Sequence, residues 1–344
     1  MQNKLKDGNL LNADGTLAEA GYATSLVKRY NPENIKAKKC RIKEWDYYLV
    51  YNSKYALALT VADNRYMGLV SASLIDFSQP TEKTTSLISW FTNGKTNLPK
   101  SSASGLTKVD NKASKMEFEV RGKKRTLKFF IKDFLNGKPL SGEITLTSEP
   151  QDSMVIATPF AGKPKAFYYN QKIVGFEASG TVMLGSKKIV FSPADSVGIL
   201  DWGRGVWTYK NTWFWSGLAG KLEDGKMFGF NFGYGFGDTS NATENMIFLN
   251  GYAHKIDRVE FVIPKTKRGK DDFMRPWKIT SGDGAVDLDF YPIIDRKACT
   301  DVLILKSDQH QVFGKFSGTV MAKNGKKVEV KNMLGFAEKV TNKW

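Results

Sequence analysis

Acidic side chains flank the most aromatic part of this sequence and are its first candidates for chemistry. Asp201 begins the stretch DWGRGVWTYKNTWFW, Asp238 ends the stretch FGFNFGYGFGD, and Glu244 follows shortly afterwards. A carboxyl group in an apolar pocket has a raised pKa and can stay protonated for general-acid work. Asp201 and Glu244 are therefore candidates to donate or return a proton. The structural alternative is that Asp201 pairs with Arg204 and that Asp238 caps the turn that it begins.

Histidine offers one further candidate. The chain has 2 histidines, which excludes a histidine-rich metal site. A Ser–His–Asp triad would have to use one of these two residues. His254 lies in NGYAHKIDRVEFVIP, where a hydrogen-bonded structural histidine is the alternative to a catalytic one. The GxGxG run lacks the Lys-Ser/Thr and the following helix of a phosphate loop. We therefore expect neither a metal nor a cofactor.

The segment Asp201–Trp215 predicts an aromatic strand face. In a β-strand alternate side chains share a face, which groups Trp207, Tyr209, Asn211, Trp213 and Trp215. A buried amide without partners costs about 1–3 kcal/mol, so Asn211 needs neighbours or a ligand. Aromatic walls with a few polar groups are typical of pockets for lipophilic molecules. A plain hydrophobic core is the alternative interpretation.

The segment 228–238 alternates in the same way. Its even positions are aromatic and include Tyr234, whereas its odd positions are glycines interrupted by Asn231. Glycine inside a strand indicates a bend, a bulge or a close approach to the backbone, and barrel closure alone could require it. The candidate ligand-binding set adds Asn231, Tyr234, Asp238 and Arg204 to the aromatic face, with Trp277 from RPWKIT as a further member.

One internal repeat organises the chain. SGTVMLGSKKIVF (179–191) and SGTVMAKNGKKVEV (317–330) each predict a β-hairpin, with Asn324-Gly325 as the turn of the second copy. The repeat indicates two related β domains in tandem, residues 1–196 and 197–344. Many alternating stretches and little helical periodicity predict an all-β protein built as a sandwich or as barrels.

Net charge and the absence of targeting signals bear on the partners and the location expected for this protein. The formal net charge is +16, but the basic residues gather in short turn-like pieces such as RGKKR and KTKRGK. No nucleic-acid motif accompanies them, so we expect no specific nucleic-acid partner, while contact with an anionic membrane surface stays open. Two distant cysteines, no apolar leader and no long apolar run favour a cytoplasmic protein. The oligomeric state is left open by the sequence.

Several long blocks carry a resemblance to a known family. IKEWDYYLV, DWGRGVWTYKNTWFW, FGFNFGYGFGDTSNATENMIF and MRPWKITSGDGAVDLDFYPIIDR resemble the uncharacterised family DUF2804, from about residue 10 to beyond residue 336. That family is similar to the tandem lipocalin-like (calycin) proteins, which include carotenoid hydratase-like and AttH-like proteins, tocopherol cyclases and fungal cyclising enzymes. The resemblance implies two antiparallel lipocalin-like β-barrels packed side by side. It supplies no activity and no matched catalytic position.

Two functions follow from these observations. The first is binding of a lipophilic small molecule in a β-barrel or in a cavity between barrels. The alternative is acid-catalysed hydration, isomerisation or cyclisation of an isoprenoid-like or polyketide-like substrate without a cofactor. In that alternative the aromatic wall would stabilise developing positive charge, and Asp201 or Glu244 would move the proton.

Overall fold

The computed structural model of the chain describes residues 2–302, 305–322 and 325–343, without the side chains of residues 300–305. Regular structure in these ranges is β-strand apart from two short 3-10 helices, η1 Pro32–Asn34 and η2 Lys39–Arg41. The predicted all-β class is confirmed, and the strands form two curled antiparallel sheets that are consistent with tandem lipocalin-like barrels. No helix in the described ranges is both long enough and apolar enough to cross a membrane.

The first sheet is built mainly from the first 206 residues. Its main strands are β4 Ile42–Tyr51, β5 Tyr55–Asp63, β6 Met67–Asp76, β7 Thr81–Trp90, β8 Gly105–Asp110, β9 Ser114–Arg121, β10 Lys124–Leu135, β11 Lys138–Thr147, β13 Lys163–Leu184 and β15 Val197–Val206. They lie in the order β7-β6-β5-β4-β15-β13-β11-β10-β9-β8. Shorter strands extend the sheet: β12 Met154–Phe160 and β14 Lys187–Phe191 pair with β13, and β2 Gly21–Ala23 pairs with β12. Outside it, β1 Gly8–Asn9 and β3 Lys28–Arg29 form a small parallel pair.

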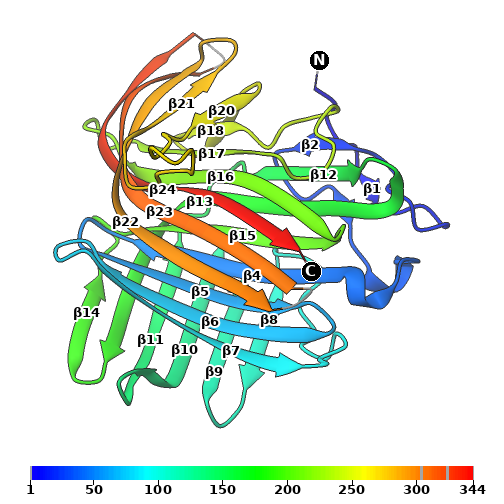
Figure 1. Cartoon of the computed structure of the whole chain (residues 1–344), viewed down its shortest axis with the longest axis horizontal. Coiled ribbons are helices and arrows are strands. Elements are labelled where there is room, and N and C mark those ends of the chain that lie inside the picture. The colour runs from blue at the N-terminus through cyan, green and yellow to red at the C-terminus, as the bar shows by residue number, and fades with distance from the viewer. Residues whose placement is uncertain (1, 303–304, 323–324, 344) are drawn as a thin grey trace.

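The second sheet contains the remaining strands. These are β16 Lys210–Lys221, β17 Met227–Tyr234, β18 Met246–Leu249, β19 Tyr252–Lys255, β20 Val259–Val262, β21 Trp277–Ser281, β22 Val286–Val302, β23 Leu305–Met321 and β24 Lys327–Lys343. Their order is β19-β18-β17-β16-β24-β23-β22-β21-β20. Figure 1 shows this sheet lying across the first one, with β13 and β15 beside β16 and β17.

Both copies of the repeat form the same hairpin. In β13–β14 Thr181 pairs with Val190, and in β23–β24 Thr319 pairs with Glu329. The predicted turn residue Asn324 lies outside the described residues. Gly180 and Gly318 have φ of 147° and 136°, and a Cβ at either would come within 2.2 Å of a carbonyl on the next strand. Glycine is therefore required at this step of each copy.

The sheets change over later than the expected domain boundary after residue 196. β15 pairs with β4 and β13 in the first sheet, and the second sheet begins with β16. The changeover thus falls at residues 207–209, in the middle of the aromatic stretch. DWGRGV belongs to β15, the last strand of the first sheet in chain order, and KNTWFW belongs to β16, the first strand of the second sheet.

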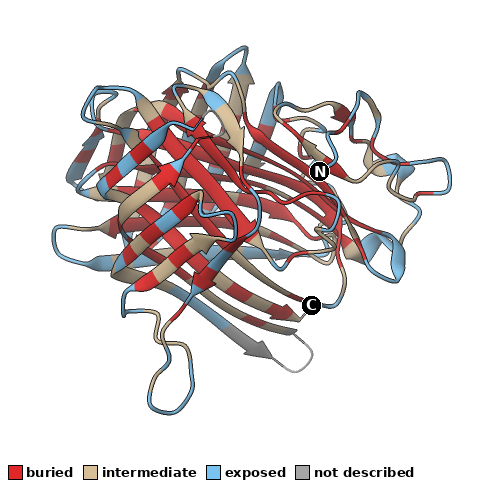
Figure 2. Ribbon diagram, turned by 90° about the horizontal axis from the view of Figure 1, so that it is seen from above, coloured by how far each residue is buried: buried red, intermediate tan, exposed pale blue. Residues whose placement is uncertain are grey.

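Glycines allow the two sheets to approach each other. A Cβ at Gly229 would lie 2.7 Å from Val174 Cγ1, and one at Gly217 would lie 3.5 Å from Ile199 Cδ1. Of the bare face predicted for residues 229–237, Gly229 and Gly237 pack against the first sheet, whereas Gly233 faces Glu244 and Gly235 faces β16. Figure 2 shows the result as an almost continuous layer of buried strands through the middle of the molecule.

The aromatic face of β17 fills the second barrel instead of lining a cavity. Phe228, Phe230 and Phe232 are fully buried, and the rings of Phe230 and Phe232 stack 4.3 Å apart. Trp277 joins the same core, where it packs on Phe290. The predicted ligand wall at these positions is hydrophobic core, because the even-numbered side chains of β17 all face inward.

Candidate functional site

Two of the predicted acids meet at one lysine between the sheets. Asp201 on β15 lies opposite Lys172 on β13, and the Lys172 Nζ is 3.8 Å from Asp201 Oδ1 and 3.4 Å from Glu244 Oε2. Asn170 Nδ2 donates to Asp201 Oδ1 at 2.6 Å. Asp201 belongs to a strand of the first sheet, and Glu244 lies in the loop between β17 and β18 of the second, so only the packing of the barrels brings the two carboxylates together.

A third acid faces this group from the second sheet. Glu338 on β24 accepts hydrogen bonds from Trp213 Nε1 at 2.8 Å and from Gln311 Nε2 at 3.0 Å. Its strand partner Trp215 places an indole ring 3.8 Å from Lys172 Nζ, close enough for a cation–π contact. We call Asp201, Glu244, Glu338, Lys172 and the aromatic rings around them the inter-sheet site.

Burial raises the pKa of Glu338 into the neutral range. Desolvation is the main cause that raises the pKa of Glu338 to about 7, and the negative charge of Asp201 adds to it. The hydrogen bonds from Trp213 and Gln311 and the charge of Lys172 act in the opposite direction. A carboxyl group with a pKa near the working pH is present in both protonation states and suits general acid–base catalysis.

The charges of all three acids affect the pKa of one side chain, Tyr168. Burial raises the pKa of this phenol well above its usual value, and the charges of Glu244, Asp201 and Glu338 raise it further. Its hydroxyl therefore stays neutral.

The backbone around Glu244 is held by side chains of the second sheet. Asn231 Nδ2 donates to the backbone oxygen of Glu244 at 2.8 Å, and its Oδ1 accepts from Trp215 Nε1 at 2.7 Å. A Cβ at Gly233 would lie 2.7 Å from Glu244 Cδ, so glycine at this position leaves the space that the carboxyl group occupies. The predicted ligand residue Asn231 thus positions Glu244.

Aromatic rings form one side of the inter-sheet site. Trp207 lies between Trp45, Trp213 and Phe236, with ring centroids 5.3, 5.8 and 4.6 Å away, and Tyr168 packs on Phe236 at 4.8 Å. The side chains of Asp201 and Glu244 keep 12% and 10% of their surface accessible. Both residues are thus largely buried, with only a small part of each side chain open to solvent.

A surface pocket of about 390 Å³ borders this region. Its wall includes Gly233, Tyr234, Asp238 and Asn245, and the Gly233 backbone abuts the Glu244 side chain. Tyr234 hydroxyl accepts from the Phe261 backbone N–H at 3.2 Å. Asp238 caps its own turn by accepting from Ser240 N at 3.0 Å, which lowers the pKa of Asp238. Thr243 and Asn245, on either side of Glu244 in the chain, line the pocket, whereas Glu244 itself does not.

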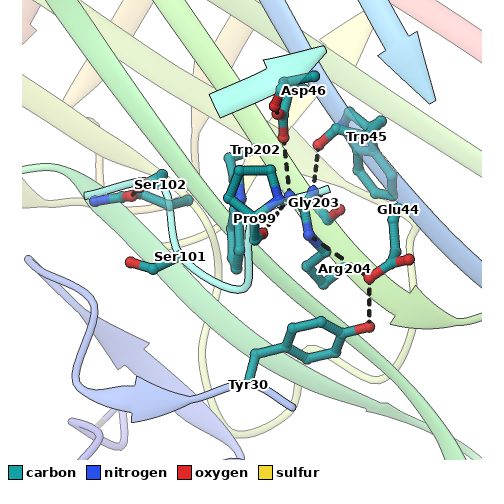
Figure 3. Close-up of polar contacts among 12 residues, drawn as sticks. Tyr30, Glu44, Trp45, Asp46, Pro99, Ser101, Ser102, Trp202, Gly203 and Arg204 are labelled. Carbon is teal, nitrogen blue, oxygen red and sulfur yellow. Dashed lines mark hydrogen bonds and ion pairs between the residues drawn. The ribbon is translucent and has the colours of Figure 1, made fainter. Parts of the chain in front are cut away.

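Arg204 belongs to a different cluster, on the opposite face of β15. Figure 3 shows its guanidinium bonded to Asp46, to the backbone oxygens of Trp45 and Pro99, and close to Glu44. The group is fully buried inside the first barrel. Arg204 therefore neither pairs with Asp201 nor lines the inter-sheet site, because successive residues of a strand point to opposite faces.

Three other predicted residues lie away from the inter-sheet site. Tyr209 is 38% exposed at the changeover between the sheets. Asn211 is satisfied locally, since its Oδ1 accepts from Thr208 Oγ1 at 2.9 Å and its Nδ2 donates to Thr208 O at 2.8 Å. His254 lies on the edge strand β19, where burial lowers its pKa and the charge of Asp152 opposes that shift. Of the two predicted sources of hydrogen bonds for Asn211, neighbours or a ligand, the structure shows a neighbour, Thr208.

The sequence interpretation missed several polar members of the site. Lys172 is the only charged residue in YYNQKIVGF, and Glu338 stands next to Lys339 in LGFAEKV. A lone charge in a buried strand needs a partner, and this signal was available. Which charge would meet which depended on the packing of the two sheets. Within the described ranges no group of three or more His, Cys, Asp and Glu side chains is arranged to hold a metal ion.

Two solved structures illustrate the similarity of fold. An AttH-like protein from Nitrosomonas europaea aligns with a TM-score of 0.54 and 12% identity, over 93% of this chain and 98% of that one. Kievitone hydratase from Nectria haematococca aligns with a TM-score of 0.50 and 10% identity, over 98% of both chains. At these identities the likeness shows the shared fold. No curated protein matched the sequence. The model of DUF2804, a domain of unknown function, matches residues 2–344, and the chain therefore belongs to the DUF2804 family.

Proposed function

We propose that the protein binds a lipophilic small molecule at the inter-sheet site. The molecule enters this site beside Glu244. The observation that carries this proposal is the combination of an aromatic wall with three buried acidic side chains, two of them partly open to solvent, in the middle of the molecule. Asn170 adds to it, because its Oδ1 is buried and has no hydrogen-bond donor among the described residues. A mainly apolar ligand with one donor group would match such a site.

A second function, acid–base catalysis on that ligand, is favoured by the pKa of Glu338. In a hydration, the Glu338 carboxyl group would donate its proton to a carbon–carbon double bond, and the nearby rings would stabilise the positive charge. Asp201 or Glu244 would accept the proton of the water whose oxygen forms the new carbon–oxygen bond. The similarity of fold to kievitone hydratase is compatible with this chemistry.

The two functions can be tested in sequence. Native mass spectrometry of freshly purified protein, followed by organic extraction, should reveal a retained lipophilic molecule. Incubation of that molecule with the protein in ¹⁸O-labelled water should then label it if the protein is a hydratase, and leave it unlabelled if the protein is a carrier.

Matched variants assign the chemistry to Glu338. Glu338→Gln should abolish labelling, whereas Glu329→Gln should not, because Glu329 lies on the same strand with 65% of its side chain exposed. Retention of no molecule, together with no response to a panel of isoprenoids and fatty acids, would contradict the binding proposal.

A further inference from the structure

An apolar patch is exposed where β7 ends, far along the chain from the inter-sheet site. Ile88, Trp90 and Phe91 are 50%, 62% and 72% exposed. Their strand neighbours Leu69 and Met67, opposite Ile88 and Trp90, are only partly buried. Other large apolar side chains are also exposed, but Ile88, Trp90 and Phe91 lie together at the end of one strand, and contiguous exposed side chains of this size mark an interaction surface.

The loop that follows β7 is firmly held in place. Phe91 N donates to Tyr66 O at 2.8 Å, and the fully buried Asp63 accepts from Thr92 Oγ1 at 2.9 Å and from Gly94 N at 3.3 Å. Phe91 has a φ of 56°, a left-handed conformation that is strained for an aromatic residue. Strain that the surrounding structure maintains is a feature of functional sites. The fold keeps an aromatic side chain at this exposed position at the expense of backbone strain.

Basic residues lie in two segments near the patch. The segment KAKKCRIK, residues 36–43, carries five basic residues and no acidic one, of which Lys36, Lys38 and Lys39 are exposed. Lys43 is buried and holds this segment beside the patch, since its Nζ lies 4.1 Å above the ring of Tyr66. Tyr66 is the residue whose backbone oxygen binds Phe91. The loop FTNGKTNLPK, residues 91–100, adds two lysines and no acidic residue. We call Ile88, Trp90, Phe91 and these basic segments the aromatic–basic patch.

We propose that the aromatic–basic patch docks the protein on an anionic lipid bilayer. Tryptophan and phenylalanine partition into the headgroup region, and nearby lysines are attracted to anionic headgroups. The aliphatic side chains of Ile88, Leu69 and Met67 favour lipid over single-stranded nucleic acid, which stacks its bases on aromatic rings. The net charge of +16 opposes docking of a second copy through the same basic surface.

Vesicle flotation tests the proposal. The full chain is mixed with vesicles of phosphatidylcholine alone or of phosphatidylcholine with phosphatidylglycerol. The protein should float with the anionic vesicles and should dissociate from them at high salt. The double variant Trp90→Ser/Phe91→Asn should lose about tenfold in vesicle affinity, and Lys38→Glu/Lys39→Glu should lose a similar factor. Asparagine tolerates the left-handed backbone at position 91, so that variant keeps its fold.

Tyr252→Ser is the matched control, because Tyr252 is 58% exposed on the distant edge strand β19. It should bind vesicles as the unmodified protein does. The proposal is overturned if the unmodified protein does not float with anionic vesicles, or if the Trp90/Phe91 variant floats equally well. It is also overturned if that variant instead loses binding to a single-stranded oligonucleotide, or elutes as a smaller species in size-exclusion chromatography.

Discussion

Glu338→Gln should change how the stability of the protein depends on pH. The carboxyl group has a pKa of about 7 in the folded protein against an ordinary value of 4.5. Between these values the folded state binds more protons than the unfolded state, so the free energy of unfolding falls as pH rises through this window. The stabilising contribution is fully present below pH 4.5 and lost above about pH 7. At about 1.4 kcal/mol per pKa unit, the change amounts to about 3 kcal/mol.

Glutamine cannot ionise, so the variant lacks this contribution to the pH dependence. It can accept from only one of the two donors, Trp213 and Gln311, and the lost hydrogen bond costs about 1 kcal/mol at every pH. The difference in unfolding free energy between the unmodified protein and Glu338→Gln should therefore shift by about 3 kcal/mol between about pH 5 and pH 8.

Denaturant titration at several pH values measures this difference, and pH effects from other groups cancel in it. The exposed-site variant Glu329→Gln should show no such shift. The reasoning is refuted if the difference in unfolding free energy between the unmodified protein and Glu338→Gln stays constant to within about 0.5 kcal/mol across this pH range. Glu338 would then ionise in the folded protein as it does in the unfolded chain.

Four further predictions follow from the contacts described above. Arg204→Met leaves the buried Asp46 carboxylate without its cation, while Glu44 keeps Arg65, and should destabilise the protein by about 3–5 kcal/mol in denaturant titration, without altering ligand retention. Asn211→Ala should cost about 1–2 kcal/mol through its lost hydrogen bonds and also leave ligand retention unchanged. Gly233→Ala should displace the Glu244 carboxyl group and weaken ligand binding by about tenfold in fluorescence titration, whereas Gly282→Ala, where a Cβ meets open space, should not. Phe91→Asn should raise stability by about 1 kcal/mol in thermal unfolding because it relieves the left-handed backbone strain.

Local sequence was sufficient to assign faces within single strands. The alternation in 228–238 separates the aromatic side chains from the glycines and Asn231, and the structure keeps that division along β17. The repeated hairpin likewise predicts its own pairing, because its glycine and its alternating residues specify the geometry locally. Asp201 and Glu244 were recognisable as candidate acids because charged residues are rare beside such apolar stretches.

Long-range packing decided the rest. The sequence does not reveal that the aromatic stretch breaks at residues 207–209, because Trp207 and Tyr209 continue the alternation through a segment that is not a strand. Nor does alternation say which strand face turns toward the other barrel, since both faces of a central strand are buried. The sequence by itself determined an all-β chain with a repeated hairpin and an aromatic strand pair. Only the tertiary structure decided that Lys172, Asp201, Glu244 and Glu338 meet, because buried charges find their partners across sheets that join residues distant in sequence.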